Sequence, residues 1–303
     1  MKIAIDGRTF LNNRDGMVRS ASGLLTQLCE EFEFEVLLSE ASTEPVGLDN
    51  SGKIRFKHFG PRSSIASLIW ENLSLVKYLN QIQPVIYHGP FNVGIPFRKV
   101  ARVRYVATVH DMIPARFPNS IPFPQLIRWR LSMVSAASNA DLIIAVSKYT
   151  KECVESHLRI SSDRIRVVHN FVPDIFFEKP EPGWTDAVRN RLALEGNYLL
   201  YWGGYRNYKN VEKLIEAFSS LPSDCDVLKL VLVGKIQDCD GERIDKAIKG
   251  CGAFRRIVKT GYLSDCELIS LIRGAKALVY LSKSEGFGYA PLEAMAVGLP
   301  CIV

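Results

Sequence analysis

Ala277-Leu-Val-Tyr-Leu-Ser-Lys-Ser-Glu-Gly-Phe-Gly-Tyr-Ala-Pro-Leu-Glu-Ala-Met-Ala-Val-Gly-Leu-Pro300 is the stretch that decides the fold. Its apolar start, residues 277–281, predicts a buried parallel strand, and a glycine-containing turn leads from it to a helix that opens near Tyr289. In such a unit, backbone amides and the helix dipole can meet a phosphate, while Glu285 and Glu293 can accept hydrogen bonds from sugar hydroxyls. The stretch therefore predicts a nucleotide-sugar site. The alternative is a helix start whose carboxylates only complement the dipole.

Outward from this stretch, apolar strand-like runs alternate with amphipathic helical ones, the pattern of an α/β fold with doubly wound parallel sheets. A linker-like break at residues 179–183 predicts two domains, 1–180 and 181–303, each long enough to bury a core. Strands are expected at residues 2–6, 35–38, 85–87, 104–109, 142–146, 165–168, 198–202, 228–233, 256–259, 278–281 and 300–303. Helices of the first domain are expected at residues 19–31, 65–81, 125–138 and 148–158.

Composition is that of an ordinary globular protein, with 47% hydrophobic and 23% charged residues. The seven cysteines are odd in number and scattered, which argues for a reducing cytosol and against a disulfide framework or zinc site. The chain starts directly with a strand, so no signal peptide is expected. The longest apolar stretch, residues 65–76, is interrupted by Glu71 and too short to span a membrane. We therefore expect a soluble cytoplasmic protein.

The net charge of +6 is concentrated in one region. Residues 98–130 contain seven basic side chains and one acid, Asp111, and the sequence Arg128-Trp-Arg130 lies in an apolar segment expected to be helical. Basic groups mixed with aromatic ones suit an anionic membrane surface, on the inner face of the membrane, or a lipid-diphosphate acceptor. A solvated face is an equal alternative. Nucleic acid is not expected as a partner, because no binding motif accompanies the patch.

The string from Glu285 to Pro300 resembles the E-x7-E signature of the retaining glycosyltransferases of the GT4 type, also called group 1. These enzymes have the GT-B fold, in which two Rossmann-like domains face a cleft. In this family the first glutamate holds hydroxyls of the transferred sugar and the second holds the ribose of the nucleotide. The resemblance assigns these roles to Glu285 and Glu293, and it places Gly286, Phe287 and Gly288 at the donor phosphate.

A second match is Trp202-Gly-Gly-Tyr-Arg-Asn-Tyr-Lys-Asn210, in which glycines between a strand and a helix allow a phosphate close to the backbone. It resembles the family element that grips the donor diphosphate. The resemblance implies a donor-binding role for Gly203, Gly204 and Lys209. The family's usual arginine before the lysine is a tyrosine here, and Arg206 is the nearest substitute. The alternative for Lys209 is a surface lysine that caps a helix.

Gly261-Tyr-Leu-Ser-Asp-Cys-Glu267 resembles the family segment whose backbone contacts the nucleotide base. Tyr262 and Leu263 are therefore base-site candidates, and simple core packing is the alternative for both. Ser264 and Glu267 also have the spacing of a capping box at a helix start.

Two histidines of the first domain follow predicted strands. Thr108-Val-His-Asp-Met-Ile-Pro114 resembles a family element whose histidine lies beside the donor sugar, which implies a catalytic role for His110. The alternative is a structural hydrogen bond to Asp111 or to backbone. His88 lies in a loop that resembles a neighbouring element on the acceptor side, and a purely structural role is equally open.

The chain's opening, with Asp6-Gly-Arg8, resembles the start of the same enzymes. Their glycine-rich loop approaches the donor phosphate and the acceptor, and Gly16 and Arg19 match it. Val18 replaces the second glycine of the pattern, which weakens the case for close backbone approach there.

Together these elements imply transfer of a hexose from a nucleotide diphosphate sugar to a saccharide or lipid-linked acceptor, with retention and without a metal or other cofactor. His110, Lys209 and Glu285 are the candidates for catalysis. The elements look most similar to mannosyl- or rhamnosyl-type enzymes of surface polysaccharide synthesis. Two alternatives stay open, another GT-B enzyme (phosphorylase or epimerase) and an inactive nucleotide-binding remnant.

The remnant alternative arises from the last residues. A strand begins at Cys301 and the sequence stops within it, whereas GT-B enzymes usually continue for several more elements. The resemblance therefore implies a second domain that is incomplete, with an unpaired strand at its edge.

Overall fold

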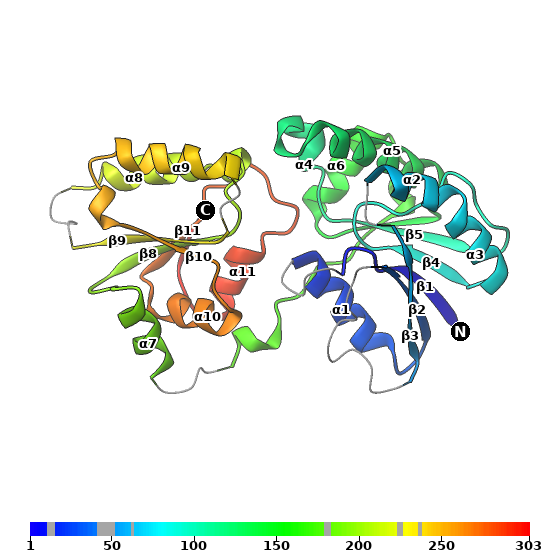
Figure 1. Ribbon diagram of the computed structural model, residues 1–303, viewed down its shortest axis with the longest axis horizontal. Coiled ribbons are helices and arrows are strands. Elements are labelled where there is room, and N and C mark those ends of the chain that lie inside the picture. Colours follow the sequence, from blue (N-terminus) through cyan, green and yellow to red (C-terminus); the bar gives the residue numbers. More distant parts are fainter. Residues whose placement is uncertain (11–15, 41–51, 62–63, 179–182, 223–226, 236–237) are drawn as a thin grey trace. The chain divides into compact units, whose positions relative to one another are not determined.

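The computed structural model describes residues 1–10, 16–40, 52–61, 64–178, 183–222, 227–235 and 238–303 (Figure 1). The chain forms two compact units, an N-terminal unit, Met1–Phe171, and a C-terminal unit, Val172–Val303. They separate ahead of the break expected at residues 179–183, most of which lies outside the described residues.

The N-terminal unit is built on a seven-stranded parallel sheet in the order β3-β2-β1-β4-β5-β6-β7. Its strands are β1 (Lys2–Asp6), β2 (Glu33–Ser39), β3 (Ile54–Gly60), β4 (Ile86–Gly89), β5 (Arg104–Val109), β6 (Leu142–Ala145) and β7 (Ile165–Val167). Its helices are α1 (Gly16–Leu28), α2 (Ser64–Asn72), α3 (Ser74–Ile82), α4 (Ile113–Arg116), η1 (Pro118–Ser120), α5 (Phe123–Asn139), α6 (Lys148–Leu158) and η2 (Ser162–Arg164).

The C-terminal unit is built on a smaller parallel sheet of five strands in the order β10-β9-β8-β11-β12. Its strands are β8 (Tyr198–Trp202), β9 (Lys229–Val233), β10 (Ile257–Gly261), β11 (Ala277–Val279) and β12 (Cys301–Ile302). Its helices are η3 (Asp174–Phe176), α7 (Trp184–Arg191), η4 (Asn207–Lys209), α8 (Val211–Ser219), α9 (Asp238–Gly250), η6 (Phe254–Arg256), α10 (Asp265–Gly274) and α11 (Tyr289–Ala296).

Helices lie on both faces of each sheet, so the central strands are buried on both sides and are mostly apolar. In the C-terminal unit, α8 and α9 lie on one side of the sheet and α7 and α10 on the other (Figure 1). The predicted α/β class is confirmed. The strands predicted at residues 2–6, 104–109 and 198–202 begin and end at the predicted residues.

The N-terminal unit differs from the expected elements in two places. Strand β3 was not predicted, because Ile54–Gly60 is a half-exposed edge strand with alternating polar residues. The single helix expected at residues 65–81 is two helices, α2 and α3, which are separated at Leu73. The apolar spacing runs through the break, so periodicity could not reveal it.

Two glycines end neighbouring strands of the C-terminal unit. Gly203 follows β8 with φ 139°, and Gly234 follows β9 with φ 141°. A Cβ atom on Gly234 would lie 2.1 Å from the carbonyl oxygen of Gly203. Both the backbone conformation and the close approach therefore require glycine at position 234.

Gly234→Ala should lower the free energy of unfolding by more than about 2 kcal/mol, because it adds backbone strain and a clash with main-chain atoms. The matched control is Gly252→Ala, where an added Cβ meets no atom within 4 Å. It should change the free energy of unfolding by less than about 1 kcal/mol. Equal urea midpoints for the two variants would contradict this account of Gly234.

Candidate functional site

The strand order of the C-terminal unit reverses at β8. The chain adds β9 and β10 on one side of β8, then returns to place β11 and β12 on the other. The loops that leave the carboxyl ends of β8 and β11 therefore diverge, and ligands of open α/β sheets bind at such a point. The two loops are also joined, since the backbone N–H of Lys283 donates to the carbonyl oxygen of Tyr208 over 2.8 Å.

Two predicted site residues, Lys209 and Glu285, meet between these loops. The Nζ atom of Lys209 lies 2.6 Å from Oε1 of Glu285 and 2.8 Å from the hydroxyl oxygen of Tyr280. The Tyr280 hydroxyl donates to the same Oε1 atom over 3.0 Å. The Lys209 and Glu285 side chains are 13% and 25% exposed, so solvent or a ligand can reach both. Sequence reasoning missed Tyr280, which it included in the buried strand.

The glycine turn and the helix after β11 complete this arrangement. Gly288, with φ 84°, is the N-cap of α11, and the rings of Phe287 and Tyr289 pack edge to face. Glu293 is buried in the second turn of α11 and accepts a hydrogen bond of 2.9 Å from the indole Nε1 of Trp202. The structure thus brings the second predicted carboxylate to the end of β8, next to the loop with Gly203 and Gly204.

Arg206 lies at the start of η4, the short helix that carries Lys209. Its Nε atom is 3.9 Å from Oδ2 of Asp240 on α9, and its side chain is partly exposed. Arg243 also contacts Asp240, at 3.0 Å. Burial raises the pKa of Asp240, against the opposing effect of Arg206.

The two base-site candidates differ in their surroundings. Tyr262 is 47% exposed, whereas Leu263 is 7% exposed and belongs to the hydrophobic core of the unit. The predicted capping box is confirmed, because Ser264 and Glu267 exchange the expected hydrogen bonds at the start of α10. Leu263 therefore has a packing role, while the Tyr262 ring can be reached by a ligand.

Two Asp-x-Asp triplets bear on the expectation that no metal takes part. Residues 224–226 lie outside the described residues, as does the side chain of the first aspartate of residues 238–240. Asp240 itself is paired with arginines. Within the described part of the chain, no group of three or more His, Cys, Asp or Glu side chains could hold a metal ion.

In the N-terminal unit the strand order reverses at β1, and charged side chains gather where β1 ends. The guanidinium of Arg8 forms a bidentate ion pair with the carboxylate of Asp6, with nitrogen–oxygen distances of 2.8 and 2.6 Å. It also makes a third contact of 2.7 Å with the carboxylate of Glu71. Arg128 reaches the same Glu71 oxygen at 3.1 Å. Although burial works against the charge, Asp6 and Glu71 raise the pKa of Arg8 above its usual value. This buried cluster, which the sequence did not predict, is internally neutralised.

The two histidines lie on neighbouring strands of the sheet. His88 is the third residue of β4, not part of the loop in which it was expected, because the strand extends to Gly89. His110 directly follows β5. His88 Nε2 lies 2.8 Å from the Thr108 hydroxyl, and burial, followed by the charge of His110, lowers the pKa of His88 from 6.5 to about 4. His110 Nε2 lies 2.7 Å from the carbonyl oxygen of Pro90. Since a carbonyl can only accept, this nitrogen carries a proton. The backbone hydrogen bond expected as the alternative for His110 is therefore present, whereas the carboxylate of Asp111 accepts from a backbone N–H.

The remaining predicted residues, Gly16 and Arg19, lie in the first turn of α1. The helix is anchored near its middle by a hydrogen bond of 2.8 Å from Ser20 to Asn170. Among all the predicted site residues, Lys209, Glu285 and Glu293 are those that the structure brings together in the C-terminal unit.

Comparison with known families covers nearly the whole chain. Residues 14–174 match the model described as Glycosyltransferase Family 4, and residues 184–303 match that of Glycosyl transferases group 1. The chain belongs to glycosyltransferase family 4. The recognition from the sequence motifs is thereby confirmed.

The curated relatives of this family 4 chain include several mannosyltransferases. It is 25% identical over 302 residues to the serotype-specific mannosyltransferase WbdA of Escherichia coli, which covers 98% of this chain and 36% of WbdA. It is 26% identical over 229 residues to the O-antigen chain mannosyltransferase B of Escherichia coli, which covers 74% of this chain and 58% of that protein. The chain thus spans about a third of the length of WbdA.

Solved structures support the predicted GT-B fold. Anabaena HepE in complex with UDP-glucose is similar over 99% of this chain and 79% of its own, with a TM-score of 0.76 and 19% identity. WaaG, a glycosyltransferase involved in lipopolysaccharide biosynthesis, has a TM-score of 0.71 at 16% identity and covers 99% of this chain and 80% of its own. The family 4 chain therefore has the GT-B fold, with the second domain the smaller one.

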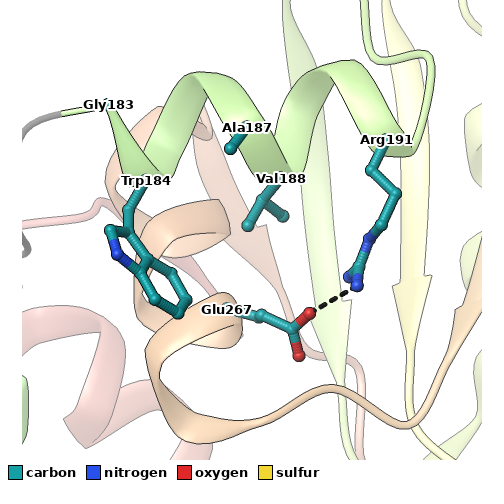
Figure 2. Close-up of a pocket in the computed structure, with 6 residues that line it drawn as sticks. All are labelled: Gly183, Trp184, Ala187, Val188, Arg191 and Glu267. Atoms are coloured by element: carbon teal, nitrogen blue, oxygen red, sulfur yellow. Dashed lines mark ion pairs between the residues drawn. The ribbon is translucent and has the colours of Figure 1, made fainter.

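A pocket of about 260 Å³ lies between α7 and α10 (Figure 2). It is lined by Gly183, Trp184, Ala187, Val188, Arg191 and Glu267. Figure 2 shows Arg191 and Glu267 joined by an ion pair, whose atoms are 2.6 Å apart. Glu267 is already engaged by this ion pair and by the capping box. None of the predicted site residues lines the pocket. We therefore interpret it as a crevice between two packed helices.

The lowered pKa of His88 makes stability depend on pH. In the unfolded chain His88 takes up a proton near pH 6.5, whereas in the folded protein it stays neutral down to about pH 4. The unfolded state therefore takes up more protons in this window, and folding stability falls as pH drops from 6.5 to 4, by roughly 3 kcal/mol at about 1.4 kcal/mol per pH unit. His88→Gln should flatten this part of the pH profile in urea unfolding, and an unchanged slope would contradict the assignment.

Proposed function

We propose that this chain transfers a hexose from a nucleotide diphosphate sugar to an acceptor hydroxyl, with retention of anomeric configuration. The observation that carries the proposal is the contact of Lys209 with Glu285 at the switch point of the C-terminal sheet, beside the buried Glu293. Family membership supports the reaction class. Because the chain spans about a third of WbdA, the activity is proposed for the region that these residues form.

In this proposal Lys209 binds the donor diphosphate, and the backbone amides of residues 286–288 together with the start of α11 add partial positive charge. These groups stabilise the negative charge that develops on the leaving diphosphate. Glu285 accepts hydrogen bonds from hydroxyls of the sugar, and Glu293 from the ribose. The exposed ring of Tyr262 contacts the base. Retention is assigned to attack from the face of the leaving group, assisted by the leaving phosphate, as the family resemblance implies.

The proposal needs no metal or other cofactor, since the positive charge of Lys209 and Arg206 takes the part that a cation would play at the diphosphate. Arg206 is suited to this part because it lies in the same loop as Lys209 and its side chain reaches solvent. In the N-terminal unit, His110 is assigned to the donor sugar, and His88, Arg19 and Gly16 to the acceptor side or the donor phosphate.

A mannosyl donor is favoured by the relatives, several of which are mannosyltransferases. A uracil base is favoured by a different observation, the UDP and UDP-glucose in structures of HepE. The acceptor is proposed to be a saccharide, free or lipid-linked, in surface polysaccharide synthesis. A phosphorylase or epimerase reaction, or nucleotide binding without turnover, is the competing function. Transfer of sugar from a nucleotide diphosphate sugar to a saccharide acceptor distinguishes the proposal from all of them.

The donor site can be tested by calorimetry with UDP, GDP, dTDP and ADP. One of them should bind, and Lys209→Ala should weaken its binding roughly 10- to 100-fold through loss of a charge-assisted hydrogen bond. The matched control is Lys213→Ala, which removes an exposed lysine of α8 that pairs with Glu216 on the same helix. Equal affinities for the two variants would exclude Lys209 from the diphosphate site.

Glu285→Gln should abolish most sugar transfer while leaving the unfolding midpoint near that of the wild type.

We also propose that the outer face of α5 contacts an anionic membrane. Phe123, Ile127, Leu131 and Val134 recur at helical spacing along this face and are all exposed, with Phe123 at 71%. The opposite face, with Leu126 and Met133, packs into the core. A stripe of apolar side chains on a helix suits the boundary between lipid head groups and acyl chains.

Basic side chains lie on α5 and on the segments packed next to it. Arg130 is exposed on α5 itself, Arg116 ends α4, which packs against α5 through η1, and Arg98 is exposed in the loop that Asn139 anchors to the end of the helix. Lys99 and Arg104 are paired with Asp141, so they contribute less. The excess of arginines is complementary to anionic lipid. In the described part of the chain, no helix is long and apolar enough to cross a membrane.

Co-sedimentation with vesicles that contain phosphatidylglycerol should therefore retain the chain, whereas pure phosphatidylcholine vesicles should not. The double variant F123S/L131S should lower partition at least about 10-fold, because two side chains lose their burial in lipid. Phe254→Ser removes an exposed aromatic side chain of the C-terminal unit and is the control. If the two variants partition alike, or if F123S/L131S only prevents self-association, the membrane assignment is wrong.

A further inference from the structure

Tyr280 is placed at the centre of the candidate donor site by its backbone and its ring. It is the first residue after β11 and is 6% exposed. Its backbone N–H donates to the carbonyl oxygen of Ile302 over 2.8 Å, which ties the residue to the sheet. Its ring stacks on Tyr201 of β8, with centroids 5.6 Å apart and planes 17° apart. The position of the hydroxyl group is therefore fixed by the rigid part of the unit.

The hydroxyl closes a triangle with Lys209 and Glu285. An ammonium group can only donate hydrogen bonds and a carboxylate can only accept them. The Tyr280 oxygen must therefore accept from Lys209, at 2.8 Å, and give its proton to Glu285, at 3.0 Å. The third side is the 2.6 Å contact between Lys209 and Glu285. A phenol is able to serve both neighbours, and a phenyl ring can serve neither.

The phenol keeps its proton at any ordinary pH. Burial, and then the negative charge of Glu285, raise the pKa of Tyr280 well above its usual value. The stacked Tyr201 is buried too, and its own hydroxyl donates to the carbonyl oxygen of Gly204 in the loop that carries Lys209. The hydrogen-bond direction within the triangle is thus constant, and the two rings shield it from water on the side of the sheet.

We propose that Tyr280 is a positioning residue of the donor site, whose hydroxyl holds the Lys209 ammonium and the Glu285 carboxylate in the orientation that receives the donor. The inference rests on the proposed function of these two residues. Lys209 directs two of its three N–H bonds to Tyr280 and Glu285, and the third is assigned to the diphosphate. Both hydrogen bonds to Glu285 end on Oε1, so Oε2 is assigned to the hydroxyls of the sugar.

The role predicts a selective loss in Tyr280→Phe. Without the hydroxyl, Lys209 and Glu285 retain their mutual ion pair but lose the group that fixes its direction. Affinity for the nucleoside diphosphate that the wild type binds best should fall about 10-fold, the usual effect of one hydrogen bond to a charged group. Affinity for the corresponding nucleoside, which has no phosphate, should stay unchanged, and kcat/KM for sugar transfer should fall further than diphosphate affinity.

The control is Tyr198→Phe. Tyr198 is fully buried at the opposite end of β8, and its hydroxyl donates to the carbonyl oxygen of Leu271 over 2.8 Å. This variant loses a buried hydrogen bond of the same unit away from the site, so its unfolding midpoint should fall while both affinities stay the same. If Tyr280→Phe behaves like Tyr198→Phe, Tyr280 is structural and the proposal is overturned.

A double-mutant cycle tests whether Tyr280 acts through Lys209. In a Lys209→Met background, adding Tyr280→Phe should change diphosphate affinity less than twofold. A further 10-fold loss in that background would show that Tyr280 acts by another route, which overturns the proposal. Failure of the wild-type chain to bind any nucleoside diphosphate would overturn the proposed function as well, whereas binding that Tyr280→Phe leaves unchanged would overturn this inference alone.

Discussion

A parallel sheet whose strand order reverses sends two neighbouring loops in opposite directions, and this constraint determines where chemistry can occur in both units. In the C-terminal unit the reversal at β8 leaves the loops after β8 and β11 on either side of one point. Lys209 and Glu285, which are 76 residues apart in sequence, meet there. In the N-terminal unit the same reversal at β1 places the buried ion cluster of Arg8 at the corresponding end of the sheet.

The two charged clusters differ in what surrounds them, and the difference separates structure from function. Arg8 and Glu71 are 6% and 2% exposed, and each meets more than one opposite charge. Breaking such a buried pair would leave an uncompensated charge, which is strongly destabilising. Lys209 and Glu285 are 13% and 25% exposed, so an anionic ligand can reach Lys209 while its pair with Glu285 stays in place. The first cluster therefore holds its unit together, and the second is suited to binding.

The sequence predicted the elements whose signals are local. Strands at residues 104–109 and 198–202, the capping box of Ser264, and the strand–turn–helix around Glu285 follow from apolar runs, glycines and short spacings. Tyr280 was missed because an aromatic residue in an apolar run looks like core, and its partner Lys209 is 71 residues away. The edge strand β3 was missed because one-sided burial dilutes the apolar signal.

The charge balance of the C-terminal site gives Arg206 its importance. In the described structure the charge of Lys209 is already balanced by Glu285, so a diphosphate would add negative charge to a nearly neutral centre. The partial charges at the start of α11 offset only about half an elementary charge.

The proposed site therefore needs a further cation, and Arg206 is the one in the same loop as Lys209. Its 3.9 Å contact with Asp240 is too long for a strong hydrogen bond, and burial raises the pKa of Asp240 although Arg206 acts to lower it. In the proposed donor complex, in which Arg206 turns to the diphosphate, Asp240 retains its shorter contact with Arg243.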